Sequence, residues 1–170
     1  MSTRGVYGFR KDGSEKITYN HSGSEPEFVG MCILEFIQQT TDEEMDTIFG
    51  QIILVNEDDV PSKEEIKECK SYFKPSERKP RDWYRLLNDL QGNLLIYKKG
   101  FKYMTDKRDF LKDTTFCEWG YILDLDKRQL EVFFFGFLLK SFPFAELREM
   151  DTAEAKEWAE SLLSSTYECE

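Results

Sequence analysis

The sequence predicts a single α+β domain with a largely antiparallel sheet, and three observations support this class. Two segments, 6–21 and 119–135, alternate apolar and polar residues around short turns, as β-hairpins do. The segments between and after them repeat apolar residues at helical spacing. A chain of 170 residues has the usual size of one domain, and no repeat divides it. We therefore expect residues 1–170 to form one domain with sheet and helices packed in layers.

The first hairpin is predicted at the N-terminus. Strand formers run from Val6 to Arg10, and Asp12 and Gly13 then supply turn chemistry, because glycine accepts positive φ and aspartate bonds its own backbone. A second strand follows from Lys16 to His21.

Helices are predicted next. Ser24 and Glu27 have the spacing of a capping box before a helix over 25–39, whose apolar face includes Cys32. Residues 42–55 predict a second helix, although the β-branched end of this segment also fits a strand.

The middle of the chain is mixed. Ser62 and Glu65 predict another capped helix that ends near Phe73. Residues 74–81 contain two prolines and many charges, which predicts an exposed loop. The remaining expectations are a helix over 81–91 that Gly92 stops, short strands over 94–97 and 101–104, and a helical turn over 106–111.

The second hairpin and a final helix complete the prediction. Residues 119–125 and 130–135 form the hairpin, and the second of these strands is apolar on both faces, as a buried strand is. Asp151 and Glu154 have capping spacing before a last amphipathic helix.

Composition narrows the function classes. The net charge of −10 disfavours binding to nucleic acid and to anionic membranes, and it favours a basic protein partner. We find no export signal and no membrane-spanning segment, so we expect a cytoplasmic protein. The single histidine and four scattered cysteines do not form a zinc pattern, and the sequence indicates no metal and no cofactor.

The opening segment carries the most specific motif. It reads TRGVYGF, then a DG turn, then KITYNHSGSEP. This pattern resembles a group of proteins of unknown activity from bacteria, phages and some eukaryotic genomes, which begin approximately T-R-G-x-x-G-[FY] and continue Y-N-H-x-D-S-x-P and Gly. The matching residues are Thr3, Arg4, Gly5, Gly8, Tyr19, Asn20, His21, Ser24, Pro26 and Gly30.

The resemblance extends along most of the chain. The segments DWYRLLNDLQG and CEWGYILDLD are similar to later parts of the same pattern, whereas Gly23 stands where the group usually has Asp. The resemblance implies a phage or prophage origin and transfers no activity.

A weaker resemblance is to N-terminal-nucleophile hydrolases, including class II glutamine amidotransferases. It rests on Ser2 followed by two strands. It implies a similar layered fold, in which Ser2, freed of Met1, attacks an amide carbonyl with its own α-amine as base. Asn20 and His21 would then assist catalysis, and Arg4 would position the substrate.

The polar residues of the first hairpin are the candidate site. Arg4, Tyr19 and Glu118 are predicted to bind a substrate or partner, and Asn20 and His21 to act in acid–base chemistry or anion binding. The alternative is structural: Asn20 and His21 cap the next helix or satisfy buried backbone groups, and Arg4 forms an ion pair with Glu118.

Two functions remain open. The first is a non-catalytic binding protein that uses its acidic surface against a basic partner. The second is an amide hydrolase or amidotransferase with Ser2 as nucleophile. Convergence of Arg4, Asn20, His21 and Glu118 on one pocket would favour a small-molecule site.

Overall fold

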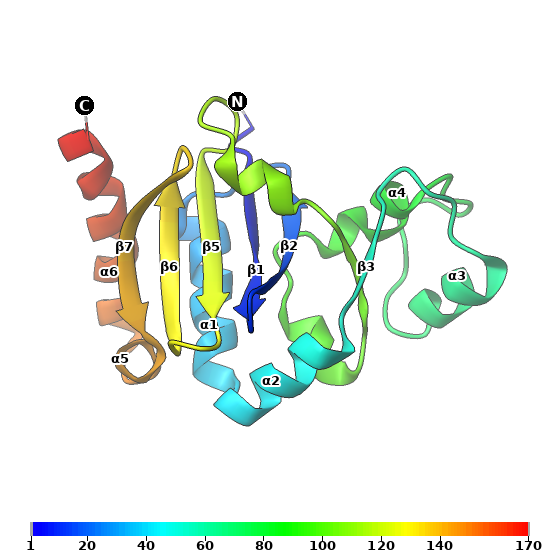
Figure 1. The fold of residues 1–170 in the computed structure, drawn as a ribbon, viewed down its shortest axis with the longest axis horizontal. Coiled ribbons are helices and arrows are strands. Elements are labelled where there is room, and N and C mark those ends of the chain that lie inside the picture. The colour runs from blue at the N-terminus through cyan, green and yellow to red at the C-terminus, as the bar shows by residue number, and fades with distance from the viewer. Residues whose placement is uncertain (1, 170) are drawn as a thin grey trace.

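A five-stranded sheet with the order β2-β1-β5-β6-β7 lies at the centre of the computed structural model, which describes residues 2–169 (Figure 1). A separate two-stranded sheet pairs β3 with β4. The strands are β1 (Gly5–Lys11), β2 (Ser14–Asn20), β3 (Ile53–Val55), β4 (Tyr103–Thr105), β5 (Trp119–Asp124), β6 (Gln129–Phe134) and β7 (Phe137–Pro143). Both predicted hairpins form, and the α+β class is confirmed.

The large sheet is antiparallel except at its centre, where β1 and β5 run parallel. This pairing joins the first hairpin to the second. Gly5 of the TRG motif lies at the close approach of the two strands, because a Cβ atom there would sit 2.4 Å from the carbonyl oxygen of Trp119. Gly5 therefore has a structural role.

Helices cover one face of this sheet. In Figure 1, α1 and α6 lie behind the strands. Phe9 of the sheet packs edge-on against Phe36 of α1, and Phe142 packs against Trp158 of α6, with ring centroids 5.9 and 5.6 Å apart. The α-helices are α1 (Met31–Gln39), α2 (Asp42–Gln51), α3 (Lys63–Lys70), α4 (Trp83–Leu87), α5 (Phe144–Arg148) and α6 (Thr152–Thr166).

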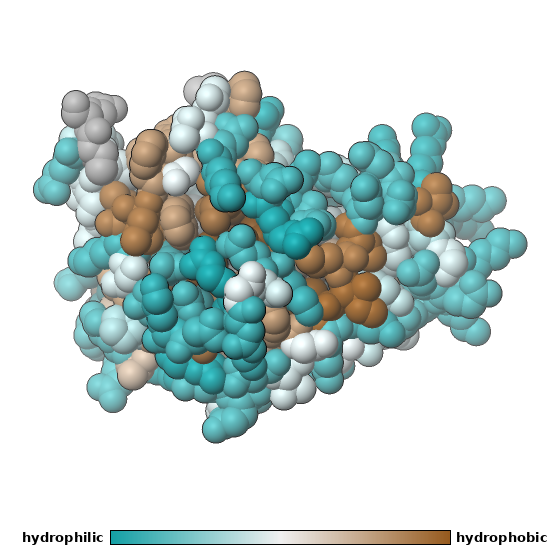
Figure 2. All heavy atoms as spheres, viewed as in Figure 1, coloured by the Kyte–Doolittle hydropathy of each residue, from teal (hydrophilic) through white to brown (hydrophobic). Residues whose placement is uncertain are grey.

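The opposite face of the sheet is covered only at one end. There the 3-10 turn Arg108–Lys112 crosses in front of the strands (Figure 1) and places Leu111 against Val6, Ile17 and Ile122. At the other end the same face carries charged side chains centred on Arg10. Figure 2 shows mainly hydrophilic residues over this lower part of the sheet.

The small sheet and α4 enclose an aromatic cluster. Trp83, Tyr97 and Phe101 are buried with Tyr103, and the Trp83 and Tyr103 rings lie 4.8 Å apart. This cluster is core, whereas Tyr84 on the same helix stays half-buried and faces a surface cleft.

The helix predicted over 25–39 differs at its start. It begins as the π-helical turn Pro26–Gly30 and continues as α1. The predicted capping box is absent, because the Ser24 hydroxyl is bonded to Asn20 instead of to a helix N–H group. Cys32, predicted on the apolar face, is exposed.

Other boundaries change for local reasons. Residues 42–55 contain both predicted alternatives, α2 followed by β3. The strand predicted over 94–97 is wrong, because residues 95–99 form a 3-10 helix. Strand β7 and helix α5 were not predicted, and β7 follows a turn in which Gly136 has φ 81°.

The capping predictions at two helices are confirmed. Ser62 with Glu65 and Asp151 with Glu154 each form a full capping box, so α3 and α6 begin where the sequence placed them. The 74–81 segment has no helix or strand and is exposed apart from two buried prolines.

Candidate functional site

An open cleft of about 490 Å³ lies beside the end of the first hairpin. We call it the aromatic cleft. It is lined by Arg4, Tyr19, His21, Glu57, Asp58, Asp82, Tyr84, Arg85, Lys107 and Phe110.

Four chain segments bring these residues together. The hairpin supplies Arg4 at the entry of β1 and Tyr19 near the end of β2, because Val6 pairs with Tyr19. The loop after β3 is held to the start of α4 by the Tyr84 N–H group, which donates to the Glu57 carbonyl at 3.0 Å. The Lys107 N–H group donates to the Ile17 carbonyl at 2.9 Å and fixes the fourth segment against β2.

Aromatic rings form one wall of the cleft. The Tyr19 ring lies 5.4 Å from Phe110, edge to face, and 6.3 Å from Tyr84. Such rings offer a rigid apolar surface with polar tips. This wall can hold the apolar or planar part of a ligand.

Tyr19 and His21 act as a polar pair within the cleft. The Tyr19 hydroxyl oxygen and His21 Nδ1 are 2.9 Å apart and share a hydrogen bond. Partial burial raises the pKa of Tyr19, Arg4 opposes that rise, and Tyr84 and Glu57 add to it. Tyr19 therefore keeps its proton at neutral pH and is available for hydrogen bonding.

Most charges in the cleft are paired within the protein. Lys107 binds Glu57 at 2.6 Å, and Arg85 binds Asp82. Arg4 and Asp58 differ, since neither forms an ion pair with any of residues 2–169. Arg4 instead lies 5.9 Å from the centre of the Phe116 ring. One cationic and one anionic group are thus left for a ligand.

Three of the predicted site residues converge here, namely Arg4, Tyr19 and His21. Asn20 does not, because its side chain is 3% exposed and points to the turn. Its Nδ2 donates to the Ser22 carbonyl at 2.8 Å and to Ser24 Oγ at 2.7 Å. Asn20 thus has the predicted structural role of satisfying backbone groups.

Glu118 also lies outside the cleft lining, and the predicted ion pair with Arg4 is absent. The two residues meet through the backbone, where the Glu118 N–H group donates to the Arg4 carbonyl at 3.0 Å. Burial raises the pKa of the Glu118 carboxyl, and nearby Glu25 adds to the rise.

Ser2 is exposed and does not line the aromatic cleft. The sequence reasoning missed Asp58, Tyr84 and Phe110 as site residues. Their proximity to Arg4 arises from tertiary packing and has no local sequence signal.

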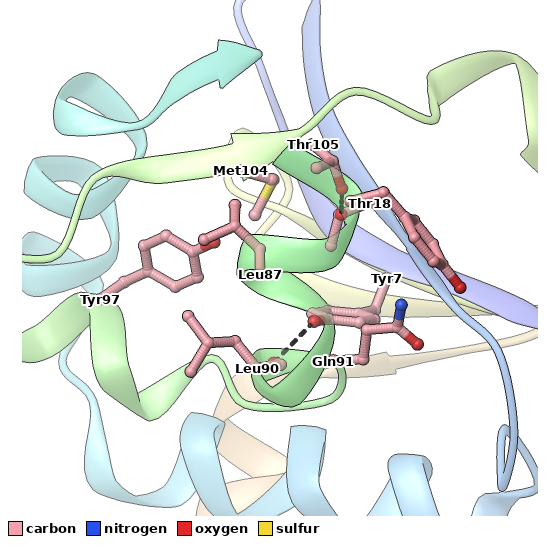
Figure 3. Close-up of a pocket in the computed structure, with 9 residues that line it drawn as sticks. Tyr7, Thr18, Leu87, Leu90, Gln91, Tyr97, Met104 and Thr105 are labelled. Atoms are coloured by element: carbon pink, nitrogen blue, oxygen red, sulfur yellow. Dashed lines mark hydrogen bonds between the residues drawn. The ribbon is translucent and has the colours of Figure 1, made fainter. Parts of the chain in front are cut away.

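A small cavity of about 20 Å³ lies between the first hairpin, α4 and β4, and its lining includes Tyr7, Thr18, Leu87 and Met104 (Figure 3). In that view the Thr18 and Thr105 side chains point toward each other, and their hydroxyl oxygens are 2.8 Å apart. Tyr7 also reaches this region and accepts a hydrogen bond from the Gly92 N–H group at 2.7 Å. This space is large enough for one water molecule and too small for a larger ligand.

Among the described side chains, those of residues 2–168, no three His, Cys, Asp or Glu gather where they could hold a metal ion. Among the described helices, none combines the length and apolar character needed to cross a bilayer.

Comparisons with known proteins give no further identification. No family model, no curated protein and no solved structure matches this chain.

Proposed function

We propose that this chain is a non-catalytic binding protein and that the aromatic cleft is its recognition site. The observation that carries the proposal is that Arg4 and Asp58, neither with an ion-pair partner among residues 2–169, line one cleft together with the wall of Tyr19, Tyr84 and Phe110. A cleft with a few polar groups around an apolar wall is the usual form of a ligand site.

The lining favours binding over covalent chemistry. The described residues around the cleft include no Ser, Thr or Cys, and Lys107, Glu57 and Asp82, which could also act as nucleophiles, are held in ion pairs. Tyr19 and His21 form a hydrogen-bonded pair suited to orienting a ligand group.

The two unpaired charges define the ligand class. Arg4 suits a carboxylate, Asp58 suits an ammonium or guanidinium group, and the aromatic wall suits an apolar segment between them. A peptide segment with basic, apolar and acidic side chains meets all three requirements. The net charge of −10 steers a partner that is basic overall toward this protein.

The test uses a blocked tripeptide, acetyl-Lys-Leu-Glu-amide, titrated into the labelled protein and followed by amide chemical shifts. We expect shifts at Tyr19, His21 and Tyr84. Arg4→Ala and Asp58→Asn should each weaken the affinity by about 1.4- to fivefold, because exposed charge pairs contribute roughly 0.2–1 kcal/mol.

Two controls make the test specific. A blocked Gln-Leu-Gln peptide has the same length without charges and should bind more weakly. Lys99→Ala removes an exposed charge that does not line the cleft and should leave the affinity unchanged. If neither Arg4→Ala nor Asp58→Asn changes the affinity measured from the chemical shifts, the proposal is contradicted.

A further inference from the structure

A second, separate groove has a volume of about 670 Å³. We call it the acidic groove. Its apolar lining comes from the Pro26–Gly30 turn, the start of α1 and the segment after Gly92, and consists of Phe28, Val29, Met31, Leu94 and Leu95.

Two glycines lie in the loops that border this groove. Gly23 and Gly92 both lie on its lining with positive φ, 69° and 85°, which fixes the two loops that border it. Phe28 projects beside Gly23 and is 59% exposed, an unusual position for a large apolar ring. Among the apolar lining residues, Phe28 is thus largely exposed and Met31 and Leu95 are partly exposed, whereas Val29 and Leu94 are buried.

Every charged side chain that lines the groove is acidic. These residues are Glu27 and Glu35, both exposed. Neither forms an ion pair with the described residues, and Glu35 accepts only a hydrogen bond from the Gln39 amide at 3.0 Å. An apolar floor between two unpaired carboxylates complements an apolar side chain flanked by Lys or Arg.

We propose that the acidic groove docks a basic amphipathic segment of a partner protein. Phe28 and Met31 would contact the apolar face of that segment, and Glu27 and Glu35 would pair with its cations. A second copy of this chain is a poor occupant, because each copy carries a net charge of −10 and the rim would repel it.

This groove is distinct from the aromatic cleft. The two share no lining residue, and they are separated where the His21 N–H group donates to Gln91 Oε1 at 2.8 Å. His21 lines the cleft and Gln91 lines the groove, so a partner that fills one lies next to the other. The groove proposal stands on its own observations and does not depend on the ligand of the cleft.

The test measures binding of a fluorescent 14-residue peptide of leucine and lysine, with leucines at helical spacing, by anisotropy. We expect binding that Phe28→Ala weakens about tenfold, as loss of a buried aromatic anchor does. Glu27→Lys with Glu35→Lys should weaken it further, and the same peptide with glutamate in place of lysine should not bind. Equal binding of the lysine and glutamate peptides would overturn the proposal.

Matched variants separate the groove from general charge attraction. Glu43→Lys with Glu146→Lys makes the same change in net charge at exposed residues outside the groove, and it should reduce binding far less. Lys99→Ala, which removes a charge outside both the groove and the aromatic cleft, should leave the peptide affinity unchanged. If the two double variants weaken binding equally, the groove is not the site. A concentration-dependent dimer that Phe28→Ala abolishes in sedimentation would likewise overturn the proposal, because the occupant would then be a second copy.

Discussion

Two arginines at opposite ends of β1 have opposite surroundings. Arg10 lies on the uncovered part of the sheet face and is paired with Glu15 at 3.2 Å, with Asp124 at 3.6 Å and with Glu131. Arg4 lies six residues earlier in the sequence. It has no ion-pair partner among residues 2–169 and borders the aromatic cleft.

The difference separates a charge that stabilises the fold from one that is available to a ligand. Asp124 and Glu131 are 3% and 6% exposed, so they depend on Arg10 for compensation. Around Arg4, by contrast, the nearby acids Glu57 and Asp82 already have other partners. Both residues are arginines. Their roles differ because the carboxylates beside Arg10 pair with it, whereas Glu57 and Asp82 near Arg4 pair with other cations.

The largest effect should come from removing the internally paired arginine. Arg10→Ala leaves two buried carboxylates without a cation, and we expect a loss of about 2 kcal/mol in unfolding free energy. Arg4→Ala should cost less than about 0.5 kcal/mol, as exposed substitutions do. Urea denaturation at pH 7 measures both. Equal losses of unfolding free energy would show that Arg10 stabilises the fold no more than Arg4 does.

A smaller effect should follow at Asp46, which is another internally paired charge. Hydrogen bonds from Arg128 and Lys11 hold the pKa of Asp46 below its usual value. A lowered pKa stabilises the folded state above the unfolded pKa, and this contribution disappears as the pH falls through the folded pKa.

Asp46→Asn should therefore cost about 0.5–1 kcal/mol at pH 7, allowing for screening by solvent, and progressively less on acidification below about pH 4. Urea midpoints between pH 2.5 and 7 measure this dependence. A loss that stays constant with pH would show that packing, and not charge, accounts for the effect.

Glu118 should respond in the opposite direction. Because burial and Glu25 raise its pKa, ionisation of Glu118 opposes folding once the pH exceeds the unfolded pKa. Glu118→Gln should raise the unfolding free energy at pH 7 by less than about 1 kcal/mol, which appears as a slightly higher melting temperature. Near pH 3 the substitution should have little effect. A lower melting temperature at pH 7 would instead indicate that Glu118 forms a favourable interaction.

The smallest effect is expected at Ser2. Ser2→Ala changes an exposed residue outside the aromatic cleft, so binding of the Lys-Leu-Glu peptide and the urea midpoint should both stay within error. A marked loss of binding would bring the N-terminal segment into the site and reopen the role predicted for Ser2.

Local sequence signals predicted those parts of the fold that local interactions determine. The capping boxes of α3 and α6 and the turn at Asp12 and Gly13 need only neighbouring residues, and each was found where expected. Strand β7 was missed because Phe137, Leu138 and Leu139 are all apolar and do not alternate as a half-buried strand does.

The site was predictable only in part for a related reason. The TRG and YNH motifs identified Arg4, Tyr19 and His21, which the hairpin register places together. The parallel pairing of β1 with β5 and the approach of Asp58 to Arg4 depend on distant segments. No periodicity or motif in a single sequence encodes such a contact.

A charge swap tests the role of Arg4 most directly. Arg4→Glu should weaken binding of the blocked Lys-Leu-Glu peptide and strengthen binding of a blocked Lys-Leu-Lys peptide, whereas Lys99→Glu, with the same change in net charge, should do neither to a comparable extent. If Arg4→Glu and Lys99→Glu shift both affinities alike, Arg4 does not contact the ligand and the aromatic cleft is not the recognition site.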